Sequence, residues 1–134
     1  MTAESENIEL IRDAFARLEE GRFEELFALA DGEIEIEHVG GARSLRGVGE
    51  ARTALDRWLD RSRRWRAVDL RYLTLGGRVL AVGHVEAEAS LGSPLSLPIA
   101  WLFTVRDGKV ARIEMYANER HARRAVEGHD ESAT

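Results

Sequence analysis

The stretch 33–38, with the sequence EIEIEH, is where the helical spacing of apolar residues changes to strand alternation. Ile34, Ile36 and His38 alternate with glutamates, which is the pattern of a strand with one apolar and one polar face. The sequence therefore predicts a strand here. We expect the side chain of His38 on the same inward face as the two isoleucines.

Helices are predicted on both sides of this strand. Residues 4–20 carry apolar side chains every three or four positions, and Gly21 follows them as a stop signal. A shorter helix is predicted over 23–30 and a third over 48–63, with a glycine-bracketed loop before the third.

The second half of the chain reads as a series of long strands. Gly76-Gly77 and Asp107-Gly108 are strong signals for tight hairpin turns. The predicted strands are 66–75, 78–89, 95–105 and 109–116, followed by a short helix over 118–126. This order indicates an α+β fold, in which a cone-shaped, strongly curved antiparallel sheet packs against about three N-terminal helices. The open end of such a cone would hold a small molecule.

Composition narrows the functional classes. The chain has 134 residues, which fits one domain over 1–127 with a frayed tail over 128–134. It has no cysteine, so disulfides and thiolate sites are excluded, and its formal charge of −5 argues against nucleic acid as a partner. No long apolar run predicts a membrane span, and we expect a cytoplasmic protein.

Neither the basic run nor the spacing of the histidines is interpreted as a binding site. The basic run over 61–66 is read as cations at the end of a helix, where they interact favourably with its dipole. No two histidines have the close spacing of metal ligands, so we expect no metal, and no motif indicates an organic cofactor.

Several motifs, in their order and spacing, resemble those of one superfamily. They are Phe15 with GRFEEL at 21–26, ADGEIEI at 30–36, LRG at 45–47, VRDGKV at 105–110 and EMY at 114–116. The chain is similar in these motifs to the SnoaL-like polyketide cyclases, ketosteroid isomerases, limonene-epoxide hydrolases and nuclear transport factor. The resemblance implies the cone fold. It says less about activity, because this fold carries many chemistries and some proteins that are not enzymes.

His38 is the first candidate for a catalytic residue. The resemblance puts it where ketosteroid isomerases carry a carboxylate base and epoxide hydrolases a water-positioning asparagine. An imidazole there would exchange protons near neutral pH. The alternative is a histidine at the rim of the core that donates to a backbone carbonyl.

His84 and Glu86 are the second candidate pair. Two residues apart on a strand, they share a face, with about 7 Å between their Cα atoms. The resemblance puts them where epoxide hydrolases hold an arginine and an aspartate, and it favours this face turned inward. In that case the opposite face of the strand, with Val79, Ala81, Val85 and Ala87, would be exposed, and its burial against a second copy predicts a homodimer. The alternation alone also allows the opposite arrangement, with the apolar face in the core.

The predicted pocket wall is apolar and aromatic. Trp58 and Trp101 are candidate walls, and the resemblance puts Trp101 where ketosteroid isomerases place a protonated carboxyl group that stabilises an oxyanion. Its indole N–H would donate one hydrogen bond to a substrate. The remaining candidates for the lining are Ile36, Leu55, Leu59, Leu97, Ile99 and Met115.

Together these features predict a protein that takes a small, largely apolar molecule into the cone. The chemistry we expect is an isomerisation, cyclisation or hydration with His38 as the base, Glu86 orienting or charging His84, and no organic cofactor. The alternative from another class is a binding or dimeric association module without turnover.

Overall fold

The computed structural model describes residues 2–38, 44–61, 63–88 and 94–132, and the side chains within them except those of 38, 58–61, 63–65, 88, 94–95 and 128–132. The helices are α1 (Ala3–Glu19), α2 (Phe23–Phe27), α3 (Gly47–Arg61) and α4 (Glu119–Ser132). The strands are β1 (Ala30–His38), β2 (Leu45–Arg46), β3 (Arg63–Leu75), β4 (Arg78–Glu88), β5 (Pro94–Arg106) and β6 (Lys109–Tyr116).

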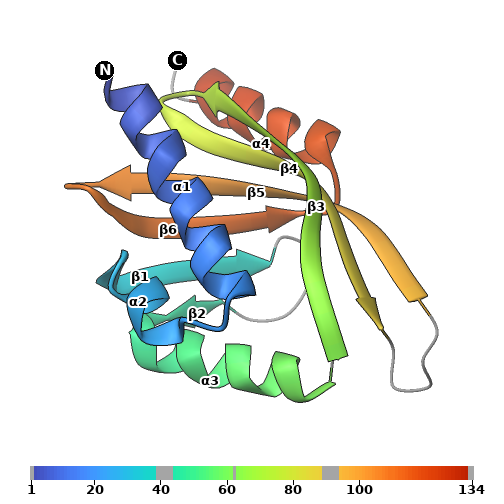
Figure 1. The fold of residues 1–134 in the computed structure, drawn as a ribbon. Coiled ribbons are helices and arrows are strands. Elements are labelled where there is room, and N and C mark those ends of the chain that lie inside the picture. The colour runs from blue at the N-terminus through green and yellow to red at the C-terminus, as the bar shows by residue number, and fades with distance from the viewer. Residues whose placement is uncertain (1, 39–43, 62, 89–93, 133–134) are drawn as a thin grey trace.

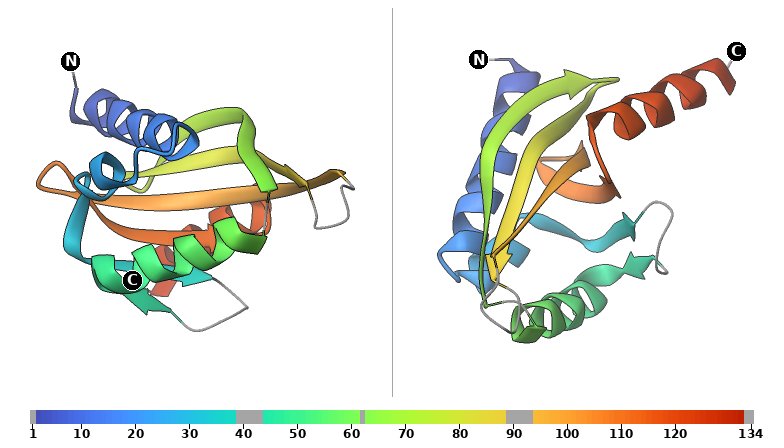
Figure 2. Two further views of the ribbon diagram at one scale, coloured as in Figure 1. Left: turned by 60° about the horizontal axis from the view of Figure 1, so that its bottom comes forward. Right: turned by 90° about the vertical axis from the view of Figure 1, so that its right-hand side faces the viewer.

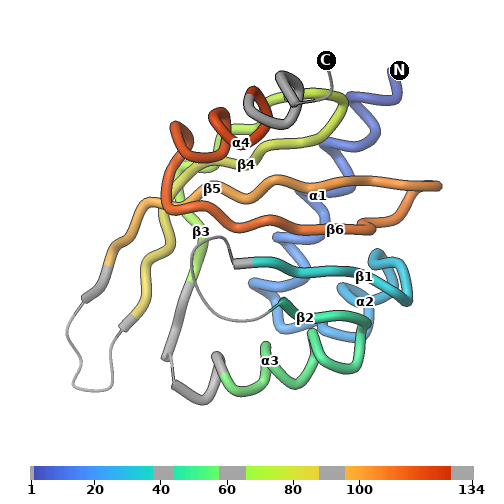
Figure 3. Tube along the Cα trace, turned by 180° about the vertical axis from the view of Figure 1, so that it is seen from behind, coloured from blue at the N-terminus to red at the C-terminus, as the bar shows by residue number. Residues whose placement is uncertain are grey.

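The strands form one six-stranded sheet in the order β2-β1-β6-β5-β4-β3. The sheet is curved and does not close on itself, and α1 and α4 lie on its opposite faces (Figures 1 and 3). Figure 2 shows α3 lying across the β1–β2 end. The α+β fold with a curved sheet and three N-terminal helices, predicted from the sequence, is confirmed.

One face of the sheet packs against α1. Val79 of β4 and Trp101 of β5 form one core with Ile11 and Phe15 of α1. The helix begins where the Thr2 side chain accepts a hydrogen bond from the Ser5 N–H, at 3.1 Å, which satisfies one of the free N–H groups of its first turn.

The other face packs against α4. Leu80 and Leu102, both fully buried, alternate with the residues that face α1, and they contact Ala122 and Val126 of α4. Burying a leucine side chain contributes about 1.5–3 kcal/mol. The parts of β4 and β5 that carry these residues are therefore covered on both faces of the sheet.

One pair of strands differs from the predicted antiparallel sheet. β1 runs parallel to β6, with His38 opposite Met115, while all other neighbours are antiparallel. A tight hairpin turn forces antiparallel pairing, but β1 and β6 are joined through α3 and four other strands, so no turn fixes their direction.

Some boundaries also differ from the predicted ones. The second helix stops at Phe27, because Ala30 already pairs with Val110 of β6 as the first residue of β1. β2 forms at the end of the predicted loop, where Leu45 pairs with Ile36. α4 continues to Ser132, so it includes most of the segment predicted as a tail.

The structure also settles which face of β4 is inward. Val79 and Ala81 are buried against α1, at 2% and 0% exposure, and Val85 on the same face lines a cavity. The apolar face that we expected to need a partner is thus covered within the chain. The homodimer stays a prediction without that support.

Candidate functional site

An apolar cavity of about 650 Å³ lies between the sheet and helices α1, α2 and α3. Its described lining has no charged side chain, and only Trp101 and Tyr116 bring a nitrogen or oxygen in their side chains. This size and composition are typical of sites for small molecules.

Six of the eight residues predicted to line a pocket do line this cavity: Ile36, Leu55, Leu97, Ile99, Trp101 and Met115. The other two, Trp58 and Leu59, belong to α3, but their side chains are outside the described residues.

Other lining residues were not predicted from the sequence. Ala51 and Ala54 lie on the same face of α3 as the predicted Leu55, and Phe15 and Leu18 share one face of α1. The helical spacing of these side chains was visible in the sequence, but it predicts only that a face is buried. Whether that face meets another side chain or an empty volume depends on tertiary packing.

Aromatic rings form one wall of the cavity. The ring of Phe15 packs edge-on against Trp101, with 5.1 Å between centroids, and against Phe103 at 5.9 Å. Edge-to-face contacts of this kind fix the orientation of the rings. The Trp101 indole N–H makes no hydrogen bond to a described residue, and its nitrogen is not among the described buried atoms that lack a partner. The one such atom is Arg112 Nε, which lies within ion-pair distance of Glu114 Oε1, at 3.5 Å, but makes no hydrogen bond.

Arg52 joins the α2 and α3 sides of the cavity. Its Nη1 lies 2.6 Å from Glu24 Oε1, and its guanidinium stacks over the ring of Phe27 at 4.8 Å from the centroid. Phe27 itself lines the cavity. A cation over an aromatic face contributes about 0.5–1 kcal/mol at an exposed site, so this contact is a modest link between the two helices.

His38 is the last residue of β1, and its backbone pairs with Met115, which lines the cavity. Ile34 and Ile36, two and four residues earlier on the same strand, also line it. The side chain of His38 is outside the described residues. Its place at the cavity therefore stays a prediction from strand alternation.

His84 and Glu86 do not line the cavity. Val85 between them does, so alternation turns both of their side chains to the other face of β4. His84 is exposed, and Glu86 pairs with Arg66 of β3 at 3.1 Å. The structure does not bring them together with the cavity, because the small apolar face of β4 is the one that faces inward.

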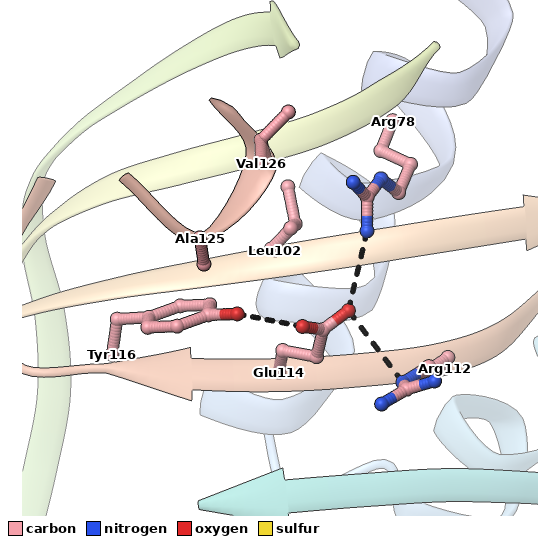
Figure 4. Close-up of a pocket in the computed structure, with 7 residues that line it drawn as sticks. All are labelled: Arg78, Leu102, Arg112, Glu114, Tyr116, Ala125 and Val126. Atoms are coloured by element: carbon pink, nitrogen blue, oxygen red, sulfur yellow. Dashed lines mark hydrogen bonds and ion pairs between the residues drawn. The ribbon is translucent and has the colours of Figure 1, made fainter. Parts of the chain in front are cut away.

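A partly buried polar cluster lies on the opposite side of the sheet, under α4 (Figure 4). Its centre is Glu114, whose side chain is only 12% exposed. The carboxylate pairs with Arg78 at 3.3 Å and with Arg112 at 3.5 Å, and it accepts a hydrogen bond of 2.6 Å from the Tyr116 hydroxyl. Arg112 also pairs with Glu37 of β1 at 2.5 Å.

The charges of this cluster alternate along the sheet and cancel. Burial first, and then the hydrogen bond to Glu114, raise the pKa of Tyr116 well above its usual value, so the hydroxyl stays protonated and remains a donor. The hydrogen bond to Glu37 raises the pKa of Arg112. A small space of about 140 Å³ adjoins the cluster, with Val126 of α4 on its wall.

This cluster as a whole was not predictable from the sequence. Alternation puts Glu114 and Tyr116 on one face of the last strand, away from the predicted pocket, but their partners come from β1 and β4, far away in the chain. Tyr116 lines both the apolar cavity and the small polar space, but its hydroxyl is bonded to Glu114.

The described residues show neither a metal site nor a membrane-spanning helix. Within the described ranges, no three His, Asp or Glu side chains gather as metal ligands would. None of the helices in the part of the chain that the structure describes is both long enough and apolar enough to cross a membrane.

Solved structures share this fold. Bal32a, from a soil-derived mobile gene cassette, is 21% identical and has a TM-score of 0.79, with 90% of this chain and 95% of that chain covered. A candidate polyketide cyclase from Xanthomonas campestris pv. campestris is 18% identical with a TM-score of 0.80, and the coverage is 93% and 99%. TerC, co-crystallised with polyporic acid, is 22% identical with a TM-score of 0.75, and the coverage is 91% and 98%.

No curated protein matches the chain. The match to a protein family is extensive, since residues 11–113 fit the SnoaL-like domain and thus include most of the elements that enclose the cavity. This chain belongs to the SnoaL-like domain family.

Proposed function

We propose that this protein binds a small, largely apolar molecule in the cavity and changes it by acid–base chemistry, in an isomerisation, cyclisation or hydration. The observation that carries the proposal is the cavity of about 650 Å³, whose described lining is free of charge. Since empty apolar volume forfeits packing contacts, an apolar ligand that fills it gains both dispersion and burial of its own surface.

Trp101 is the proposed hydrogen-bond donor for the ligand. Its indole lies in the cavity wall with its ring held by Phe15, and no described group accepts from its N–H. In an apolar site a single donor orients a carbonyl or similar acceptor, because few other polar groups of the lining compete for that acceptor. The ligand class that fits is therefore an apolar molecule with an oxygen acceptor. TerC, a neighbour of the same fold, was co-crystallised with polyporic acid, which supports small-molecule binding by this fold.

His38 is the proposed base. The supports are strand alternation from Ile34 and Ile36 and the pairing of its backbone with Met115, a residue of the cavity wall. A neutral imidazole next to apolar surface accepts a proton from a weak carbon acid and returns it elsewhere on the same substrate. No organic cofactor is required for such a step.

The test uses a probe reaction that needs only a base in an apolar site. In a nitrobenzisoxazole the base removes the ring C–H proton, and the N–O bond breaks to give a coloured cyanonitrophenolate. We expect saturable turnover with the wild-type protein and a loss of at least about tenfold in kcat for His38→Ala. His84→Ala is the matched control, because His84 is exposed and does not line the cavity. Equal rates for the two variants would remove His38 from the mechanism.

A second function, binding without turnover, is favoured by one observation. The described lining contains no histidine, carboxylate, lysine or arginine, and its one hydroxyl group, that of Tyr116, is already bonded to Glu114. This function predicts that the probe binds saturably and that the wild-type protein does not accelerate its reaction.

A further inference from the structure

We propose that Arg112 is a positioning residue, which holds the end of β1, and with it the backbone of His38, in register with β6. This inference rests on the proposed function insofar as it takes His38 as the base. Arg112 lies on the face of the sheet opposite the cavity, so it would act through the strand and not on the ligand.

The geometry places the ion pair directly beside His38. Glu37 is opposite Glu114 in the β1–β6 pairing, and His38 is opposite Met115. Arg112 Nη2 lies 2.5 Å from Glu37 Oε2, and Arg112 Nε lies 3.5 Å from Glu114 Oε1. One guanidinium therefore connects the two carboxylates that face each other across the two strands.

The pairing with β6 is the described attachment of this end of β1. Among the described residues, β1 pairs on its outer side with β2 at Glu35 and Ile36, and on its other side His38 pairs with Met115 of β6. The β1–β6 pairing also changes register between Ala30 and Glu35. A parallel pair is slightly less stable per residue than an antiparallel pair, which makes a side-chain clamp more valuable here.

Glu114 is a firm anchor for this clamp. Its side chain is 12% exposed, and Arg78 and the Tyr116 hydroxyl fix its two oxygens from the other directions. Figure 4 shows Arg78 and Arg112 approaching the carboxylate from different strands. Only Arg112 continues to β1, whereas Arg78 reaches Glu114 from β4 and makes no described contact with β1. Arg78 is thus a natural control.

The experiment compares Arg112→Met with Arg78→Met by amide hydrogen exchange and by the nitrobenzisoxazole reaction. We expect Arg112→Met to speed exchange at residues 37, 38, 114 and 115 at least about tenfold more than Arg78→Met does. We expect kcat to fall about tenfold with KM within about twofold, because a base displaced by a fraction of an ångström loses its alignment while the cavity remains. Arg112→Lys should restore part of kcat.

Equal exchange at these amides in the two variants would overturn the proposal. If the turnover of the wild-type protein depends on His38, an unchanged kcat for Arg112→Met would overturn it as well. If Arg112→Met does not fold, Glu37→Gln weakens the same pair from the β1 side. The Glu37 side chain is half-exposed, so the loss of its charge costs less stability than at a buried residue. The exchange readout does not need turnover, so it decides the positioning even if the wild-type protein proves inactive and the proposed chemistry fails.

Discussion

Replacing Glu114 by glutamine tests the energetic importance of the polar cluster under α4. The substitution keeps the shape of the side chain but removes the charge that faces Arg78, Arg112 and the Tyr116 hydroxyl. Breaking a fully buried ion pair from one side costs about 3–5 kcal/mol. The two arginine side chains are 23% and 42% exposed, so solvent screens part of this loss.

We therefore expect Glu114→Gln to lower the free energy of unfolding by about 2 kcal/mol. For a domain of this length that corresponds to a fall in Tm of about 7 °C, measured by circular dichroism at neutral pH. Glu35→Gln is the matched control, since Glu35 pairs with Arg46 at 3.1 Å but both side chains are well exposed. It should cost less than about 0.5 kcal/mol. Equal shifts in Tm for the two variants would refute the reasoning.

Three further outcomes are expected. Gly83→Ala should destabilise the fold by about 1–3 kcal/mol, measured by urea unfolding. The added Cβ would lie 2.6 Å from the Val68 carbonyl oxygen, which is a backbone atom and cannot rotate away. An unchanged urea midpoint would contradict this. Burial raises the pKa of Tyr116, so this group stabilises the fold below about pH 10, and that contribution is lost as the pH rises further. Tyr116→Phe should therefore reduce the fall in the free energy of unfolding at alkaline pH. An equal fall in the wild-type protein and the variant would contradict this. Arg123 first, and then Arg71, lower the pKa of Glu119, so the contribution of Glu119 to stability is present above about pH 4.5 and is lost as the pH falls. Glu119→Gln should therefore reduce the fall in Tm at acid pH. An equal fall in the wild-type protein and the variant would count against the pairing.

The hairpins were predictable because their turns have local requirements. Gly76 and Gly77 have φ values of 59° and 76°, and Asp107 and Gly108 have 53° and 74°, a conformation that glycine and aspartate tolerate far better than β-branched residues. The sequence of these turns therefore fixes the β3–β4 and β5–β6 pairs. The parallel β1–β6 pair has no such local signal, and only the tertiary fold shows it.

The orientation of β4 was not predictable from alternation alone. Both of its faces carry apolar side chains in the upper half, because α1 packs on Val79 and Ala81 while α4 packs on Leu80. The presence of a second helix on the far face is a tertiary fact. It explains why His84 and Glu86 were candidates in the sequence yet lie away from the cavity.

The candidate site was predictable where one strand face carried it. Alternation put Ile99 with Trp101 on one face of β5 and Met115 with Ile113 on one face of β6, and the resemblance then indicated that Met115 faces inward. The cluster around Glu114 was not, since it depends on Arg78 crossing over β5 to reach a carboxylate of β6. Charges on a strand usually face water, and only the position of α4 makes this site partly buried.

The central claim, that the cavity binds an apolar molecule, is tested most directly by titrating acetonaphthone, a neutral bicyclic ketone, into three proteins by calorimetry. Ala54 lines the cavity from α3, while its neighbour Thr53 is exposed. We predict saturable binding to the wild-type protein and to Thr53→Trp, and affinity at least about tenfold weaker for Ala54→Trp, whose indole would fill the space. No saturable binding by the wild-type protein, or equal binding by two folded tryptophan variants, would contradict the account.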